Sequence, residues 1–298
     1  MIDSILITNM KTTESMTLSK AGNGKMVLDN EGVDWGEVEA SIYTYKSPKQ
    51  IGAEVSGVDI EPRPISVIGW LYGTQAQIEE SQFELGVFFI PGSTIRISAK
   101  GYFIEGVVQN SPAFSKKVKE NNEYMCKFII NIYCGNPEFI KEIPTVVDYG
   151  STSPALHFPF HFTSSSGVIF GIKEIQTLKK IENKGVHQVG SVIHFRCVGD
   201  SIKSPKIFNV YNQEEFILID KTLTYGEEVI INTNMNKQSV TGIVNGVKSD
   251  YFKYWNFGGT WIQIPVGDTY LAVEYEGSAG ALEVSVETVD TYYSIEGM

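Results

Sequence analysis

The sequence lacks the features that place a chain in several common classes of protein. It has three cysteines, Cys126, Cys134 and Cys197, without Cys-x-x-Cys spacing. That number and spacing predict neither a disulfide framework nor a zinc knuckle, so we expect three buried thiols. No apolar run approaches the roughly 20 residues of a membrane-spanning helix, which predicts no membrane insertion. Asp3 comes early and no basic or long apolar segment follows it, so we expect no secretory signal.

Positive charge is also scarce. The 298 residues contain 24 Lys and Arg against 35 Asp and Glu, a formal net charge of -11. Proteins that hold nucleic acid use basic side chains to release counterions from phosphates. We therefore expect no specific nucleic-acid binding, although an acidic channel could let DNA pass without holding it.

Motifs for catalysis or cofactor binding are missing too. The chain has no nucleophile elbow, no His-Glu-x-x-His, no P-loop and no dinucleotide-binding glycine pattern. His157 and His161 would share one face of a strand, yet no further ligand is nominated for zinc, so a solvent-facing pair over a phenylalanine core is favoured. The acidic stretch 29–37 does not match a calcium loop. We expect no enzyme, no catalytic residues, no cofactor and no metal.

What the sequence does contain is alternation of apolar and polar residues, which is typical of half-buried strands. Residues 271–276 and 282–287 alternate on either side of a Gly-containing turn at 277–280 and are predicted to form a hairpin. Asn245-Gly246 between two valines predicts a second hairpin. Further strands are expected at 65–72, 94–99, 102–108, 125–133, 192–197, 216–220, 229–233 and 261–264.

One helix interrupts the strands, near residues 74–90. Thr74 and Gln77 have the spacing of a capping box, and Ile78, Leu85 and Phe89 share one helical face. The helix should end near Pro91-Gly92. The period of the apolar residues at 172–181 would by itself predict another short helix.

The chain length favours two domains. A stretch rich in Gly, Pro and small polar residues follows a predicted strand between Cys134 and Ser153. The sequence therefore predicts two β-rich domains, 1–140 with the helix and 141–298.

Aromatic residues cluster near the C-terminal end of the second half. Tyr251, Tyr254, Trp255, Phe257 and Trp261 lie within eleven positions, and aromatic faces of this kind can stack on sugars or partner loops. Core packing or a seam between subunits is the favoured alternative. Trp255, Trp261 and Tyr254 are the candidate recognition or interface residues.

Strings of residues, in order, resemble the distal tail protein (Dit) family of long-tailed phages and Gram-positive prophages. The strings that carry this resemblance are Thr44–Gly52, Ser56–Gly69 with its Pro-Arg-x-Ile core, the helix and Pro-Gly break, Lys100–Phe114, Cys134–Phe139, the His-Phe-Pro-Phe-His-Phe run, Asn183–Asp200, Pro205–Asp220, the Asn-Gly hairpin and Trp261–Gly277. The likeness covers nearly the whole chain. It also implies strands at 172–181, against the local helical period.

The resemblance implies an architecture and a role. The N-terminal β-sandwich domain with its helix would form a ring, expected to be a hexamer, and the C-terminal domain would be a galectin-like β-sandwich. Such a ring connects the tail tube protein to the tail-associated tip protein and can anchor receptor-binding proteins at the virion tail tip, after synthesis and assembly in the host cytoplasm. Identical chains pairing head to tail through sheet edges can close into such a ring.

Two other functions stay open at this point. A carbohydrate-binding β-sandwich module is the main alternative, because of the C-terminal resemblance and the two tryptophans. A cell-wall hydrolase is a weaker one, since no acid-base or nucleophile constellation supports it.

Overall fold

β-Strands make up most of the chain, as the alternating sequence predicts. The computed structural model describes residues 2–21, 24–149, 151–154, 171–174 and 177–296 and is mainly β, with a single α-helix in these ranges. The chain folds as two units. The first contains residues 1–142 and the chain from Tyr292 onward, and the second contains Ile143–Thr291.

The first unit is built on one large sheet. Its strands are β1 (Ser4–Asn9), β2 (Ser15–Ser19), β3 (Met26–Asp34), β6 (Arg63–Tyr72), β7 (Thr94–Ala99), β8 (Tyr102–Val108), β9 (Ala113–Phe114), β10 (Met125–Cys134), β11 (Phe139–Lys141) and β25 (Thr291–Tyr292). The main path runs β2-β1-β7-β8-β10-β6-β3, with β9 beside β10, β11 beside β8, and β25 beside β11. β10 and β6 pair over their full length, from Met125 opposite Tyr72 to Cys134 opposite Arg63.

Helix α1 (Gln75–Phe88) forms where the capping box predicted it. The Thr74 N–H donates a hydrogen bond to Gln77 Oε1 at 2.9 Å, which satisfies one backbone group at the start of the helix. The predicted face is confirmed, because Ile78, Leu85 and Phe89 are all buried in the same core as the inward side chains of the sheet.

The C-terminal residues of the described chain, from Tyr292 onward, belong to the first unit, which differs from the sequence-based division of the chain at 140/141. That division placed them in the second half, whereas Ile295 is buried in the core of the first unit. The Tyr292 ring also meets the Tyr102 ring edge-on, with 5.6 Å between the ring centroids, which is within the range of about 4.5–7 Å for such pairs. A few apolar side chains at a chain end are enough to select another core, and composition does not reveal this choice.

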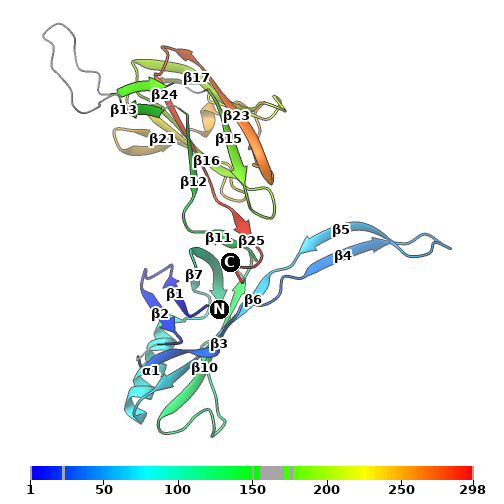
Figure 1. Cartoon of the computed structure of the whole chain (residues 1–298), viewed down its shortest axis with the longest axis vertical. Coiled ribbons are helices and arrows are strands. Elements are labelled where there is room, and N and C mark those ends of the chain that lie inside the picture. Colours follow the sequence, from blue (N-terminus) through cyan, green and yellow to red (C-terminus); the bar gives the residue numbers. More distant parts are fainter. Residues whose placement is uncertain (1, 22–23, 150, 155–170, 175–176, 297–298) are drawn as a thin grey trace, which may run out of the picture. The chain divides into compact units, whose positions relative to one another are not determined.

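A separate two-stranded sheet extends from the first unit. It consists of β4 (Ala40–Tyr45) and β5 (Glu54–Ile60), which pair only with each other in the described chain. Figure 1 shows this β4–β5 hairpin projecting away from β3 and β6. At its base the Glu61 N–H donates to the Glu39 carbonyl at 2.9 Å, so the hairpin continues the β3–β6 edge.

The second unit is a β-sandwich. One sheet has the order β12 (Thr145–Tyr149), β24 (Leu282–Thr288), β16 (Ser191–Cys197), β20 (Glu228–Asn232), β21 (Ser239–Val244), β22 (Val247–Asp250). The other has the order β15 (Leu178–Asn183), β23 (Gly267–Gly277), β17 (Ser201–Asn209), β18 (Phe216–Leu218), with β19 (Thr222–Thr224) also on β17. Phe195 and Ile231 from the first sheet share a core with Ile207 and Leu271 from the second. Smaller elements are β13 (Ser151–Pro154), β14 (Gly171–Glu174) and the 3-10 turn η1 (Phe252–Tyr254).

Two local predictions in this unit are confirmed. Asn245 and Gly246 have φ of 50° and 80° and connect β21 to β22, with Val244 opposite Val247. Positive φ at both turn positions is what a tight two-residue hairpin requires. β14 and β15 lie where the resemblance implied strands and the local period indicated a helix, because pairing with β13 and β23 outweighs local preference.

Two other predictions are wrong. The segments at 271–276 and 282–287 do not form a hairpin, because β23 pairs with β15 and β17 whereas β24 pairs with β12 and β16. The connection crosses from one sheet to the other, so Val273 and Val284 reach the same core from opposite sides. Residues 261–264 form no strand either. Ile264 makes only an isolated bridge to Val189.

Several expectations concern small groups of residues. Cys126, Cys134 and Cys197 are free and buried, as predicted. His157 and His161 lie outside the described residues. Within the described ranges, no helix is long and apolar enough to cross a bilayer, and no three His, Cys, Asp or Glu side chains are grouped to hold a metal ion.

Candidate interaction surfaces

The β4–β5 hairpin carries an apolar face that nothing in the described chain covers. Ile42 lies opposite Val58, and their side chains are 61% and 54% exposed. Val55 and Ile60 are also exposed, and Ala40 lies opposite Ile60. Successive strand residues point to opposite faces, which places Ala40, Ile42, Val58 and Ile60 on one side of the hairpin. A register shift between Tyr43 and Thr44 pairs Val55 with Thr44 and so brings Val55 to the same side.

The other face of the hairpin is polar and aromatic. Tyr43 lies opposite Gly57, and a Cβ on Gly57 would be in ordinary contact with the tyrosine ring at 3.6 Å. A hydrogen bond with Asp59 raises the pKa of Tyr43. Ser41 Oγ donates to Glu61 Oε1 at 2.5 Å. These contacts set the register of the hairpin without burying its apolar side.

The tip of the hairpin is basic. Lys46 and Lys49 are exposed there, and Ile51 is fully exposed. The Ser47 N–H donates to Gln50 Oε1 at 2.9 Å and the Gln50 N–H donates to the Ser47 carbonyl at 3.1 Å, which fold the tip into a compact turn. The apolar arm therefore ends in two positive charges, in a chain of net charge -11.

Isolated two-stranded hairpins are marginally stable in water, and contiguous exposed apolar side chains mark interaction sites. Both generalisations apply here. β4 and β5 form a separate two-stranded sheet, and the paired Ile42 and Val58 are exposed, with no core beneath them in the described chain. The β4–β5 hairpin is therefore a candidate docking element.

A second candidate surface of the first unit is a groove between α1 and β2. It encloses about 610 Å³ and has apolar walls from Met16, Phe83 and Val87, with Glu14 and Glu84 also lining it. Phe83 is 75% exposed, so one apolar face of α1 is left uncovered by its own unit. This α1–β2 groove is apolar with an acidic border.

The aromatic residues of the second unit form a stack that runs into the core. The rings of Trp255 and Trp261 are 4.2 Å apart with an interplanar angle of 19°, and Phe252 stacks on Trp261 at 6.4 Å and 12°. Trp255 is 5% exposed, whereas Phe252 is 43% exposed. The Phe252 end is thus the exposed end of the stack, and Phe257 beside it is exposed as well.

A buried polar network lies next to η1. Glu227 is 3% exposed and its carboxylate accepts hydrogen bonds from Lys221 Nζ at 2.5 Å and from the Tyr251 hydroxyl at 2.7 Å. The Thr224 N–H donates a third, at 3.1 Å. Tyr254 packs edge-on against Tyr251 at 5.1 Å, with Lys221 over both rings. The network satisfies the buried groups and holds η1 in place.

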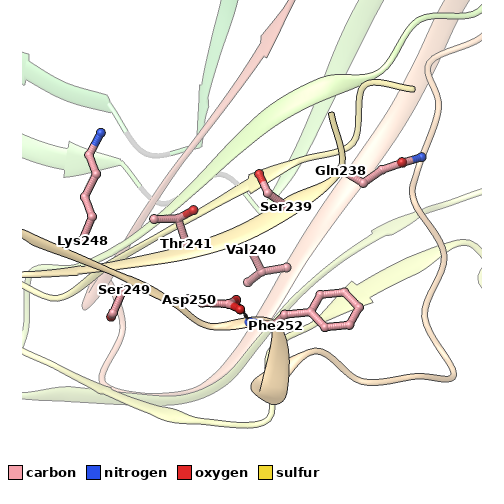
Figure 2. Close-up of a pocket in the computed structure, with 8 residues that line it drawn as sticks. All are labelled: Gln238, Ser239, Val240, Thr241, Lys248, Ser249, Asp250 and Phe252. Atoms are coloured by element: carbon pink, nitrogen blue, oxygen red, sulfur yellow. Dashed lines mark hydrogen bonds between the residues drawn. The ribbon is translucent and has the colours of Figure 1, made fainter. Parts of the chain in front are cut away.

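A hollow of about 430 Å³ lies at the exposed end of the stack. Figure 2 shows Phe252 at one side of it and Lys248 toward the other, with Ser239 and Thr241 of β21 between them. Asp250 Oδ1 accepts a hydrogen bond from the Phe252 N–H at 2.8 Å, which fixes the start of η1. Most of the lining residues are of polar type, and one is aromatic.

Sequence reasoning found some of these surfaces and missed others. It brought together Tyr254, Trp255 and Trp261, which the structure does place in contact with one core. It did not single out Ile42 or Val58. The hairpin could have been predicted from the β-branched residues on both sides of the Ser-Pro-Lys turn, since this pattern is typical of a hairpin.

The fold of the chain is similar to that of solved phage proteins. The Dit protein of phage SPP1, described as a paradigm of the hub adsorption apparatus in Gram-positive infecting phages, gives a TM-score of 0.67 at 10% identity and covers 96% of this chain and 98% of that one. The phage P2 baseplate in its activated conformation gives 0.52 at 12% identity with calcium, covering 96% and 98%, and 0.51 at 10% with strontium, covering 97% and 98%. No family model and no curated protein matches the sequence. The chain therefore has the fold of phage distal tail and baseplate hub proteins along nearly its whole length.

Proposed function

We propose that the chain is a structural, non-enzymatic component of a phage or prophage tail tip that assembles into a closed ring of identical copies. The observation that carries this proposal is the similarity of both units together, in one chain, to the SPP1 hub protein. The role as a connector of tail tube, tip protein and receptor-binding proteins, and the expected six copies, rest on that likeness. A structural role without catalysis agrees with the lack of catalytic motifs in the sequence.

The β4–β5 hairpin supports the self-association. Its apolar side chains gain stability only if another surface covers them, and a second copy of the chain provides such a surface in a head-to-tail contact that closes into a ring. The α1–β2 groove is complementary in character. Lys46 and Lys49 at the hairpin tip would face Glu14 and Glu84 at the groove of the neighbouring copy.

Light scattering after size exclusion tests the ring. We expect a mass several times 33.1 kDa, with a central hole in negative-stain images. Val58→Asp should reduce the mass to that of one protomer, because a charge would replace part of the apolar face. Val118→Asp, at a position 83% exposed outside the hairpin, is the matched control and should leave the ring intact. A wild-type protein that stays monomeric at high concentration contradicts the proposal.

The groove itself has a separate test. Lys46→Glu with Lys49→Glu should weaken the ring, and adding Glu14→Lys with Glu84→Lys should restore it, because the charges are then exchanged between the two surfaces. Restoration by the second pair supports the groove as the hairpin's site. Failure of the second pair to restore assembly argues for another contact surface.

Carbohydrate binding is a second candidate, which the hollow at β21 and β22 favours. Polar side chains around one exposed aromatic ring are suited to hydroxyl-rich ligands. The appropriate probe is Phe252 and not Trp255, since Trp255 is buried. Binding on a glycan array that Phe252→Ala abolishes would support this function, and no binding by the wild type would remove it.

A further inference from the structure

The wall of a cavity of about 400 Å³ in the first unit includes Arg63, which has no carboxylate partner among the described residues. Trp35, Arg63 and Phe139 line it, together with the C-terminal stretch that includes Tyr293. Arg63 follows Pro62 at the start of β6, and its side chain is 2% exposed. A charged residue this deeply buried is uncommon unless something pairs with it.

The guanidinium group is only partly satisfied. Its Nη2 donates a hydrogen bond to the Tyr293 carbonyl, and the group lies over the Phe139 ring at 5.0 Å. Nε is buried and has no hydrogen-bond partner among the described residues. Because a guanidinium carries five N–H groups, much of the donor capacity of Arg63 is unused.

No described group neutralises the charge. Arg63 forms no ion pair in the part of the chain that the structure describes, and the carboxylates of Glu37 and Glu296, which line the same cavity, belong to exposed residues. Burial raises the pKa of the nearby Cys134 thiol to about 12, so this thiol is neutral at physiological pH and offers no negative charge. Burial also lowers the pKa of Arg63, although arginine remains protonated in proteins. An uncompensated buried charge is strongly unfavourable.

The surroundings favour one class of counterion. The planar fork of a guanidinium matches a carboxylate, and apolar walls strengthen such a pair. Trp35 and Phe139 provide these walls, with their rings edge-to-face at 5.1 Å. Glu37 and Glu296 repel anions, and they repel a doubly charged phosphate about twice as strongly as a singly charged carboxylate. The volume also falls within the usual range of small-ligand sites.

We propose that this cavity binds a carboxylate group, with Arg63 as its ion-pair partner. The carboxylate belongs to an acidic side chain of a neighbouring protein or to a small organic acid. This site is independent of the β4–β5 hairpin and of the α1–β2 groove.

Trp35 provides a direct readout. Sodium acetate, the smallest carrier of the group, is titrated at constant ionic strength against sodium chloride while tryptophan fluorescence is followed. We expect a saturable change in the wild type that disappears in Trp35→Phe. Arg63→Gln should weaken acetate binding about tenfold or more, because a charge-assisted pair is lost. An acetate curve that is unchanged in folded Arg63→Gln, or no saturable response in the wild type, overturns the proposal.

A second variant keeps the test valid if Arg63→Gln does not fold. Glu37→Gln with Glu296→Gln retains Arg63 and removes two exposed like charges from the cavity, so acetate should bind several-fold more tightly. Unchanged affinity in this variant overturns the site. Light scattering of folded Arg63→Gln then separates the two sources. Loss of self-association assigns the carboxylate to a second copy of the chain, and unchanged assembly with weakened acetate binding assigns it to a separate acid or partner.

Discussion

The ring of Phe128 lies against Gly69 across the β10–β6 pair. The two residues are direct register partners, and a Cβ added to Gly69 would come within 2.4 Å of Phe128 Cζ and 2.7 Å of the Val27 carbonyl oxygen. Phe128 is fully buried in the first core. Glycine in a strand interior is normally unfavourable, so here its benefit is the space that it leaves for the ring.

Gly69→Ala should therefore destabilise the first unit by about 1–3 kcal/mol, since overpacking moves the ring or the strand. Gly86→Ala is the matched control. It lies in α1 with no atom near the new methyl group, and it should stabilise by roughly 0.5–1 kcal/mol through helix propensity. Urea unfolding measures both. Equal free energies of unfolding for the two variants would contradict the packing argument.

The buried Glu227 makes the second unit sensitive to acid. Burial raises its pKa, but hydrogen bonds from Lys221, Tyr251 and the Thr224 N–H outweigh burial and hold the pKa below its ordinary value of 4.5. A carboxyl whose folded pKa is lowered stabilises the fold above about pH 4.5, and this contribution is lost as the pH falls through the folded pKa.

Glu227→Gln should lower the free energy of unfolding of the second unit at neutral pH and flatten its fall below pH 4.5. The exposed Glu214→Gln is the control and should keep the wild-type profile. Unfolding curves between pH 7 and pH 3 provide the measurement. A wild-type profile in Glu227→Gln would show that the network does not contribute to acid sensitivity.

Truncation of the aromatic stack should depend on burial and not on residue type. Trp255→Ala removes a buried ring and is expected to cost about 3–5 kcal/mol, whereas Phe257→Ala, at a position 79% exposed, should stay within about 0.5 kcal/mol. Thermal unfolding of the second unit distinguishes them. A small effect of Trp255→Ala would indicate that its ring serves recognition more than packing.

The sequence predicted elements wherever local chemistry decides the structure. The capping box at Thr74 located α1, and Asn245-Gly246 located the β21–β22 turn, because in both cases a few adjacent residues carry the cause. Alternation also predicted which side chains of β23 and β24 are buried. It could not predict that they belong to different sheets, because the alternation is the same for either partner.

The interaction sites were harder to predict, because they depend on what the fold leaves uncovered. The apolar residues of β4 and β5 have the composition of ordinary core strands, and only the structure shows that no core lies beneath them. Arg63 lies in the string that carries the family resemblance, yet its burial without a carboxylate partner follows from the approach of the C-terminal Tyr293. Long-range contacts of this kind leave no local pattern in a single sequence.

Proteolysis of the hairpin tip provides a last prediction. Lys46 and Lys49 are exposed trypsin sites at the end of an arm that has no core, so trypsin should cut there first in isolated protomers. In the proposed ring the arm is covered, and cleavage of the wild type should slow about tenfold or more as the protein concentration rises. Val58→Asp, which is expected to stay unassembled, should be cut at the same rate at every concentration. If the wild type behaves like this variant while remaining oligomeric, the hairpin is not at the contact between copies.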